Sequence, residues 1–258
     1  MEAAQTYADA RVHPSDFTFS LEKQSGSWGV QKLLVVRTGA NKTNLHERHL
    51  PPIKNRRIEL KVRAAGDASS CRGFVSADVV VDCRKLISTH LAGSGSIKPK
   101  HDGRNLHLLD TVLTCYTEAF GTTLVEVIVA ALQTDQTSSI AATPCRCILF
   151  CQQGRHRSVA CAYWFAILLT ILGAEVTVEA PFARLCSCRT CDAGTYTLLA
   201  RHWDTWCVLI QKSTIKYLKT QDTYGSIVRD GLRDTIEFLD YCFIGLIPSL
   251  IPDSIWVS

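Results

Sequence analysis

The sequence lacks an apolar run long enough to cross a membrane. Its longest, Val159–Ala174, is shorter than the roughly 20 residues of a spanning helix, and the apolar stretch at 241–251 is broken by Pro248. The first residues also lack the basic and apolar regions of a secretory signal. We therefore expect a soluble cytoplasmic protein that has no membrane partner and keeps its 12 cysteines reduced.

Two other features are missing. No Gly-x4-Gly-Lys-Ser/Thr loop is present, which argues against a nucleotide hydrolase of that type, and no internal repeat is visible. The net charge of +4 is too small to indicate nucleic-acid binding by itself. Basic side chains do gather between residues 37 and 63, namely Lys42, Arg48, Lys54, Arg56, Arg57, Lys61 and Arg63. Either an RNA-binding surface or a solvated basic loop is consistent with them.

Hydropathy patterning predicts an α/β fold. Strands are expected at 30–37, 58–62, 77–83, 148–150 and 175–179, and helices at 106–120, 122–132, 159–172, 198–218 and 226–244. This order implies a mostly parallel sheet with helices on both faces, plus a helical C-terminal extension. The β-branched run 79–81 predicts a strand buried on both faces.

Composition divides the chain into three parts. Residues 1–57 are expected to be a poorly ordered or peripheral segment. Residues 58–180 hold the α/β domain, and residues 181–258 a cysteine-containing, mainly helical extension.

The most informative stretch is Cys-Gln-Gln-Gly-Arg-His-Arg-Ser, residues 151–158, between a predicted strand and an apolar helix with Ser158 as its expected N-cap. Such a turn directs backbone N–H groups at an anion, and the helix dipole adds positive charge. Gly154 permits the turn. Charged donors follow it: Arg155, His156 and Arg157. We predict a phosphate- or carboxylate-binding loop; a basic turn between two core elements is the alternative.

The spacing Cys151-x5-Arg157-Ser158 is also that of cysteine-dependent phosphatases. There the cysteine attacks phosphorus as a thiolate, and the arginine binds two phosphoryl oxygens. Phe150 stands where those enzymes have His, and their general acid has only Asp82, Asp110 and Asp135 as candidates. Catalysis by Cys151, Arg157 and Asp82 is therefore the alternative to binding without turnover.

A second polar strand end, Asp82-Cys-Arg84, follows the strand expected at 77–83. Ligands of parallel sheets bind beyond the carboxyl ends of the strands, so we expect Asp82 and Arg84 to share a crevice with the Cys151 loop. A purely structural ion pair between Asp82 and Arg84 is the other interpretation.

Together these segments carry a family resemblance. Residues 77–84 read Ala-Asp-Val-Val-Val-Asp-Cys-Arg, and residues 151–159 read Cys-Gln-Gln-Gly-Arg-His-Arg-Ser-Val. The chain resembles the C-terminal domain of the RNase adapter protein RapZ family, which has Ala-Asp-x3-Asp-x-Arg and then Cys-Thr-Gly-Gly-x-His-Arg-Ser-Val. The resemblance covers roughly residues 58–178, with Gln152 and Gln153 in place of Thr and Gly.

This resemblance implies an α/β domain with a pocket for a phosphosugar-like anion, in a family whose bacterial members bind small regulatory RNA. By position, the pocket residues are Asp82, Arg84, Cys151, Gly154, His156, Arg157 and Ser158. The expected ligand is a phosphorylated small molecule of the amino-sugar phosphate class, bound in a regulatory role, with RNA as a further possible partner.

A cysteine cluster in the C-terminal part offers a metal site. Cys188-x2-Cys191 has the spacing of a zinc knuckle, and Cys186 together with a later thiolate such as Cys207 would complete a tetrahedron. His202 is a further candidate ligand. Zinc is one interpretation of this cluster, and free thiols are the other.

Overall fold

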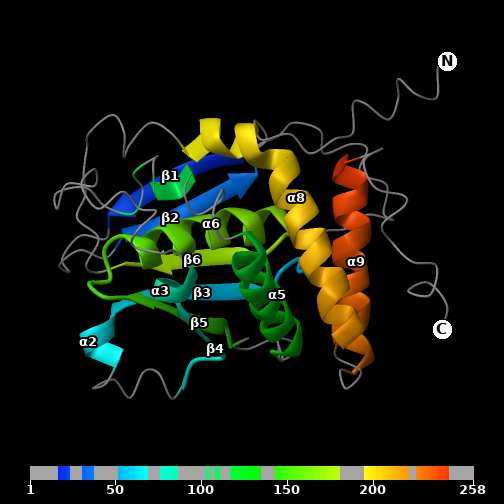
Figure 1. The fold of residues 1–258 in the computed structure, drawn as a ribbon, viewed down its shortest axis with the longest axis horizontal. Helices are drawn as coiled ribbons and strands as arrows, with labels where there is room; N and C mark the ends of the chain where they lie inside the picture. Colours follow the sequence, from blue (N-terminus) through cyan, green and yellow to red (C-terminus); the bar gives the residue numbers. More distant parts are fainter. Residues whose placement is uncertain are drawn as a thin grey trace.

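The computed structural model describes residues 17–23, 31–37, 52–68, 76–86, 103, 105, 108–110, 117–134, 143–180, 195–220 and 225–243. Its central sheet has four parallel strands in the order β4-β5-β3-β6 (Figure 1). The strands are β3 (Arg57–Ala64), β4 (Val79–Asp82), β5 (Cys145–Cys151) and β6 (Glu175–Glu179). The predicted α/β fold is confirmed.

The described helices are α2 (Ala65–Ala68), α3 (Cys83–Leu86), α5 (Thr117–Gln133), α6 (Arg157–Ile171), α8 (Thr195–Thr220) and α9 (Ser226–Phe243). The two helices expected in the C-terminal part correspond to α8 and α9. The expected break near 121 is wrong, because Gly121 lies inside α5, where a side chain would overlap Ser213 of α8. None of these helices combines the length and apolar character that a membrane span requires.

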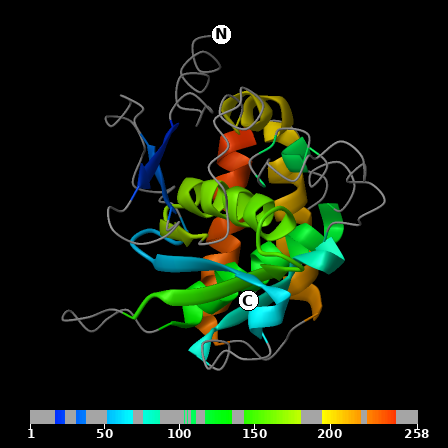
Figure 2. The ribbon, with the colours of Figure 1, turned by 90° about the vertical axis from the view of Figure 1, so that its left-hand side faces the viewer.

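A separate hairpin lies beside the parallel sheet. Its strands, β1 (Phe17–Lys23) and β2 (Gln31–Arg37), pair antiparallel, and β2 lies against β6 and α6 (Figure 2). The second strand was expected and the first was not. Yet Phe17, Phe19 and Leu21 alternate with polar residues, which is the ordinary signal of a strand.

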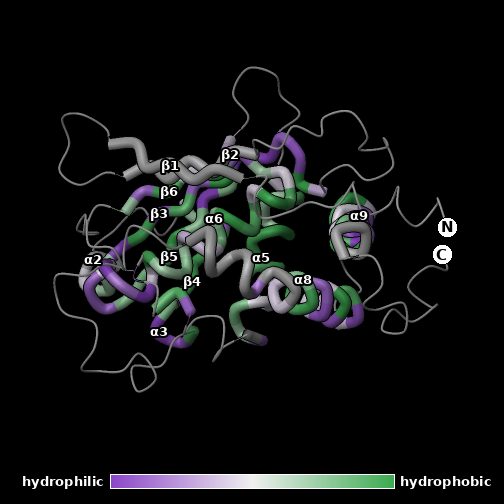
Figure 3. The backbone as a smooth tube through the Cα atoms, turned by 90° about the horizontal axis from the view of Figure 1, so that it is seen from above, coloured by the Kyte–Doolittle hydropathy of each residue, from purple (hydrophilic) through white to green (hydrophobic). Residues whose placement is uncertain are grey.

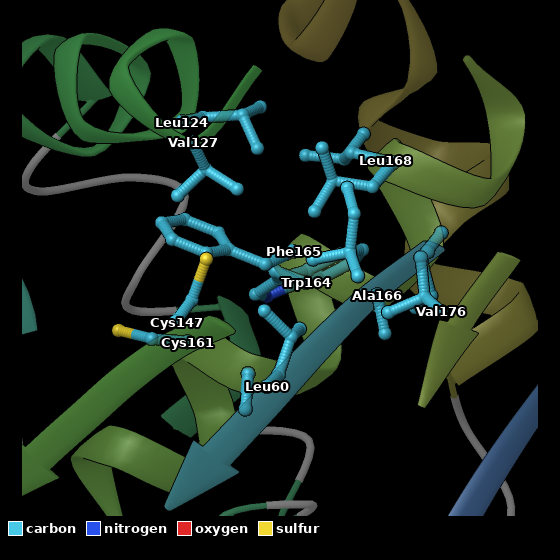
Figure 4. Close-up of a cluster of buried hydrophobic side chains, with 14 of the residues drawn as sticks. Leu60, Leu124, Val127, Cys147, Cys161, Trp164, Phe165, Ala166, Leu168 and Val176 are labelled. Atoms are coloured by element: carbon cyan, nitrogen blue, oxygen red, sulfur yellow. The ribbon is translucent and has the colours of Figure 1, made fainter. Parts of the chain in front are cut away.

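One face of the sheet forms the core. In β3 the side chains of Ile58, Leu60 and Val62 are buried, and the intervening residues are only partly so. Helix α6 packs on this face and is buried on every side from Ser158 to Leu169. Residues of α5, α6 and β3 meet there (Figure 4), and the ring centroids of Phe120 and Phe165 lie 4.8 Å apart. Burying this much apolar side chain is the main stabilising term of the fold.

The opposite face carries charged side chains on β3 and β6 and apolar ones, Val80, Ile148 and Phe150, on β4 and β5. Arg63 pairs with Glu179 at 3.0 Å, and Lys61 with Glu59 at 3.3 Å. The expectation that residues 79–81 are buried on both faces is wrong, because β4 is an edge strand and Val80 is 47% exposed.

The carboxyl ends of the strands lie at one end of the molecule. Helix α2 begins at the end of β3, and α9 lies at the far end from it (Figures 1 and 3). The polar strand ends are therefore remote from α9.

Candidate functional site

The two polar strand ends share one edge of the sheet, as predicted. Strands β4 and β5 are neighbours, and Asp82 is the partner of Phe150 in their register. Asp82 is the last residue of β4, and Phe150 is the next-to-last residue of β5. The segments that follow, Cys83–Leu86 and the loop after Cys151, therefore begin side by side.

Gly154 makes the turn after β5 possible. Its φ of +63° lies in the left-handed region that favours glycine, and its N–H donates to the carbonyl oxygen of Cys151 at 3.3 Å. A Cβ here would lie 2.9 Å from the backbone of Arg63 and Ala64. The loop thus rests directly on the end of β3, and no larger residue fits.

Ser158 does not have the predicted capping role. Helix α6 begins at Arg157 with His156 as its N-cap, and no side chain caps it. The hydroxyl of Ser158, fully buried, instead lies 3.1 Å from the Sγ atom of Cys151. A buried thiol and a buried hydroxyl each need a polar partner, and they satisfy one another.

Hydrogen-bond donors converge on Cys151. Burial by itself raises the pKa of its thiol, because the charged form is desolvated. Hydrogen bonds from the Ser158 hydroxyl and from the backbone amides of Ser158, His156 and Arg155 outweigh burial and lower this pKa below its ordinary value. The donors at the start of α6 are therefore placed to stabilise negative charge on this sulfur. Anion binding by the loop stays a prediction.

Arg84 lies beside this loop on a platform of two residues. Its Nε and Nη2 atoms donate to both carboxylate oxygens of Asp82, at 2.8 and 2.7 Å. Its guanidinium carbon lies 5.1 Å from the centre of the Phe150 ring, a cation–π contact. Phe150 stands where the phosphatases have His, and here its ring supports the Arg84 guanidinium. It can do so because Phe150 is the strand partner of Asp82, which binds Arg84.

The Arg84 pair also fixes the charge of Asp82. The hydrogen bond with Arg84 holds the pKa of this carboxyl below its ordinary value. A carboxylate that stays ionised is a poor general acid. The geometry therefore favours an orienting role for Asp82 over proton donation.

A segment not predicted to belong to the site covers the start of α6. Gly103 donates its N–H to the carbonyl oxygen of Arg155 at 3.0 Å, and a Cβ at Gly103 would overlap His156 and Val159. Asn105, two residues after Gly103, is only 8% exposed. This contact of Gly103 joins residues about 50 positions apart in the sequence, so no local pattern predicts it.

The other general-acid candidates lie elsewhere. The Oδ1 atom of Asp110 lies 2.7 Å from Nε2 of His202 on α8, at hydrogen-bond distance. The neighbouring Leu109 accepts a hydrogen bond from Trp164, about two turns into α6. Asp110 is thus placed along the helix and not at its start, and Asp135 lies outside the described residues.

The zinc prediction falls largely on undescribed residues. Cys186, Cys188 and Cys191 lie outside the part that the structure describes, and Cys207 is a buried residue of α8 that forms no disulfide. Within the described ranges no group of three or more His, Cys, Asp or Glu residues is placed to hold a metal. Zinc binding stays a prediction.

The basic stretch is described in part. Lys54 and Arg57 are exposed, whereas Lys61 and Arg63 form the ion pairs given above. Lys42 and Arg48 lie outside the described residues. RNA binding by this stretch also stays a prediction.

The basic side chains of the loop are partly buried. Arg155, His156 and Arg157 are each partly exposed, and Gln152 and Gln153 are exposed.

Comparison of the chain with models of known protein families, with curated proteins and with solved structures gave no match. The resemblance to the RapZ C-terminal domain therefore rests on the two sequence segments alone.

Proposed function

We propose that this domain binds the phosphoryl group of a small phosphorylated molecule in the loop from Cys151 to Ser158, without turnover. One observation carries the proposal: at the start of α6 the Ser158 hydroxyl, 3.1 Å from the sulfur of Cys151, and the backbone amides of Arg155, His156 and Ser158 converge on one point of the loop. Donors that stabilise a thiolate also stabilise a phosphoryl dianion placed beside it.

The neighbouring cations complete the proposed site. Arg157, the first residue of α6, binds two phosphoryl oxygens in bidentate fashion, and His156 donates when protonated. Arg84, held over Phe150 by Asp82, contacts the rest of the ligand. Asp82 accepts from a hydroxyl or ammonium group, which fits an amino-sugar phosphate.

The RapZ resemblance supports the same ligand class and a regulatory role. Two of the positions that differ from the family, Gln152 and Gln153, are exposed side chains, so this exchange leaves the backbone donors in place. A cytoplasmic location and RNA as a further partner belong to the same proposal and rest on the resemblance and on the sequence.

Calorimetry tests the proposal. We expect glucosamine 6-phosphate to bind and unphosphorylated glucosamine not to bind. The loss of a charge-assisted contact costs about 1.5–3 kcal/mol, so Arg157→Ala should weaken binding about 10- to 100-fold. Lys212→Ala removes an equal charge from an exposed position of α8 and should leave binding unchanged. Equal affinity of wild type and Arg157→Ala would remove the proposal.

A second candidate is a cysteine-dependent phosphatase. The 3.1 Å contact between Ser158 and Cys151, with the lowered pKa of the thiol, favours it. The thiolate would attack phosphorus and expel the ester oxygen, leaving a thiophosphoryl enzyme for water to hydrolyse. Release of nitrophenolate from p-nitrophenyl phosphate, abolished in Cys151→Ser, supports this reaction. No release between about pH 5 and 8 excludes it.

A further inference from the structure

We infer that Cys151 is a site of reversible oxidation and that Cys83 is the residue that closes a disulfide with it. This goes beyond ligand binding, since it concerns a covalent bond between two residues of the chain. Cys83 and Cys151 are both buried thiols that form no disulfide in the structure. The disulfide is therefore a product of oxidation and not a structural bridge.

The register of the sheet brings the two cysteines together. Asp82 is the partner of Phe150, and the residues that follow each of them are Cys83 and Cys151. Cys83 begins α3, which contacts β5. Neighbouring strands lie about 4.8 Å apart, and a disulfide joins Cα atoms roughly 4.4–6.8 Å apart.

The two thiols also lie in one part of the core. Cys83 is the first residue of α3, directly after the last residue of β4, and Cys151 is the last residue of β5. Cys83 is 0% and Cys151 is 3% exposed, within the same hydrophobic cluster. The charge of Cys151 acts on the Cys83 thiol, which agrees with their being neighbours.

The two thiols differ in reactivity in the way the reaction requires. Burial raises the pKa of Cys83, and so do its hydrogen bond with Cys161 and the nearby charge of Cys151. The donors at the start of α6 lower the pKa of Cys151. Of these two buried thiols, Cys151 is the one that we expect a peroxide to oxidise first, because the thiolate is the reactive form.

A second close pair on β5 lacks this property. The Sγ atoms of Cys145 and Cys147 lie 3.9 Å apart. Their mutual hydrogen bond, together with burial, raises the pKa of Cys147. Without a stabilised thiolate this pair should stay reduced.

The reaction balances with hydrogen peroxide as the oxidant. The Cys151 thiolate displaces hydroxide from the peroxide and becomes a sulfenic acid, Cys–SOH. The sulfur of Cys83 then attacks the sulfenic sulfur, and its proton leaves with the hydroxyl group as water. Two thiols lose two electrons and one peroxide yields two waters. A dithiol reductant reverses the step.

Peptide mapping tests the inference on the full chain. After brief peroxide treatment and alkylation of remaining thiols, trypsin releases residues 73–84, which hold Cys83, and residues 147–155, which hold Cys147 and Cys151. We expect these two peptides joined in the unreduced digest, with fragmentation placing the bond on Cys151. A thiol reductant should separate them.

Two matched variants complete the test. Cys83→Ala should abolish the joined peptide and leave Cys151 trapped as a dimedone adduct, while Cys161→Ala should still form the 83–151 bond. A disulfide between Cys151 and Cys161, or between Cys145 and Cys147, would overturn the inference. So would unmodified Cys151 in wild-type protein. Because the readout is a covalent bond, it is independent of whether the loop binds a phosphorylated ligand.

Discussion

Replacing Ser158 by Ala removes one hydrogen bond from the charged sulfur of Cys151. The Ser158 hydroxyl is 3.1 Å from Sγ and fully buried, so water cannot replace it. The three backbone amides remain, because the substitution leaves the main chain of α6 unchanged. We therefore expect the pKa of Cys151 to rise toward its ordinary value, with the fold retained.

The size of the effect follows from the energy of such a bond. A hydrogen bond to a charged group contributes about 1.5–3 kcal/mol. Its loss in Ser158→Ala should therefore lower the fraction of Cys151 that is thiolate at neutral pH roughly 10- to 100-fold. A thiolate of higher pKa is a better nucleophile, with a Brønsted coefficient of about 0.4–0.5. The two effects partly cancel, so alkylation of Cys151 should slow about 3- to 10-fold.

The assay is timed alkylation with iodoacetamide, followed by mass spectrometry of the peptide that carries Cys151. Ser213→Ala on α8 removes another buried hydroxyl and serves as the control. It should leave the rate at Cys151 unchanged. Equal rates in wild type and Ser158→Ala would refute the assignment of the Ser158 hydroxyl as a stabiliser of the thiolate.

Three further substitutions probe the surroundings. Gly154→Ala adds a Cβ at φ +63° and 2.9 Å from backbone atoms, so urea unfolding should show a loss of at least about 1–3 kcal/mol, whereas Gly66→Ala, with open space around it, should show less. Asp82→Asn should lower the unfolding free energy at neutral pH. Because the folded-state pKa of Asp82 is depressed, the difference from wild type should shrink as pH falls below about 3.8 and vanish below the folded-state pKa. A difference that persists in strong acid would contradict the ion pair. Phe165→Ala should cost about 3–5 kcal/mol and Ile227→Ala, 67% exposed, under about 0.5. Equal costs would place Phe165 outside the core.

Local patterns predicted most of the described fold. The alternation of Ile58, Leu60 and Val62 marks β3 because one face of that strand is buried, and the unbroken apolar run of α6 marks a helix buried on all sides. The turn at Gly154 was also predictable, because few residues other than glycine adopt its φ. These features depend only on neighbours in the sequence.

The roles of side chains within the site were less accessible. Ser158 is a residue type that often caps helices, but its hydroxyl is hydrogen-bonded to the thiol of Cys151, seven residues earlier and across the loop. Phe150 supports Arg84, which comes from a different strand end. Gly103 contacts His156 from a segment of no regular pattern. Each role depends on a long-range contact, which no local propensity encodes.

Protection of Cys151 by phosphate tests the central claim most directly. If the donors at the start of α6 hold either the thiolate or a phosphoryl group beside it, inorganic phosphate or glucosamine 6-phosphate should slow alkylation of Cys151 in a saturable way. The protection should be lost in Arg157→Ala. An alkylation rate that does not change with either ligand at any concentration would contradict anion binding at this loop.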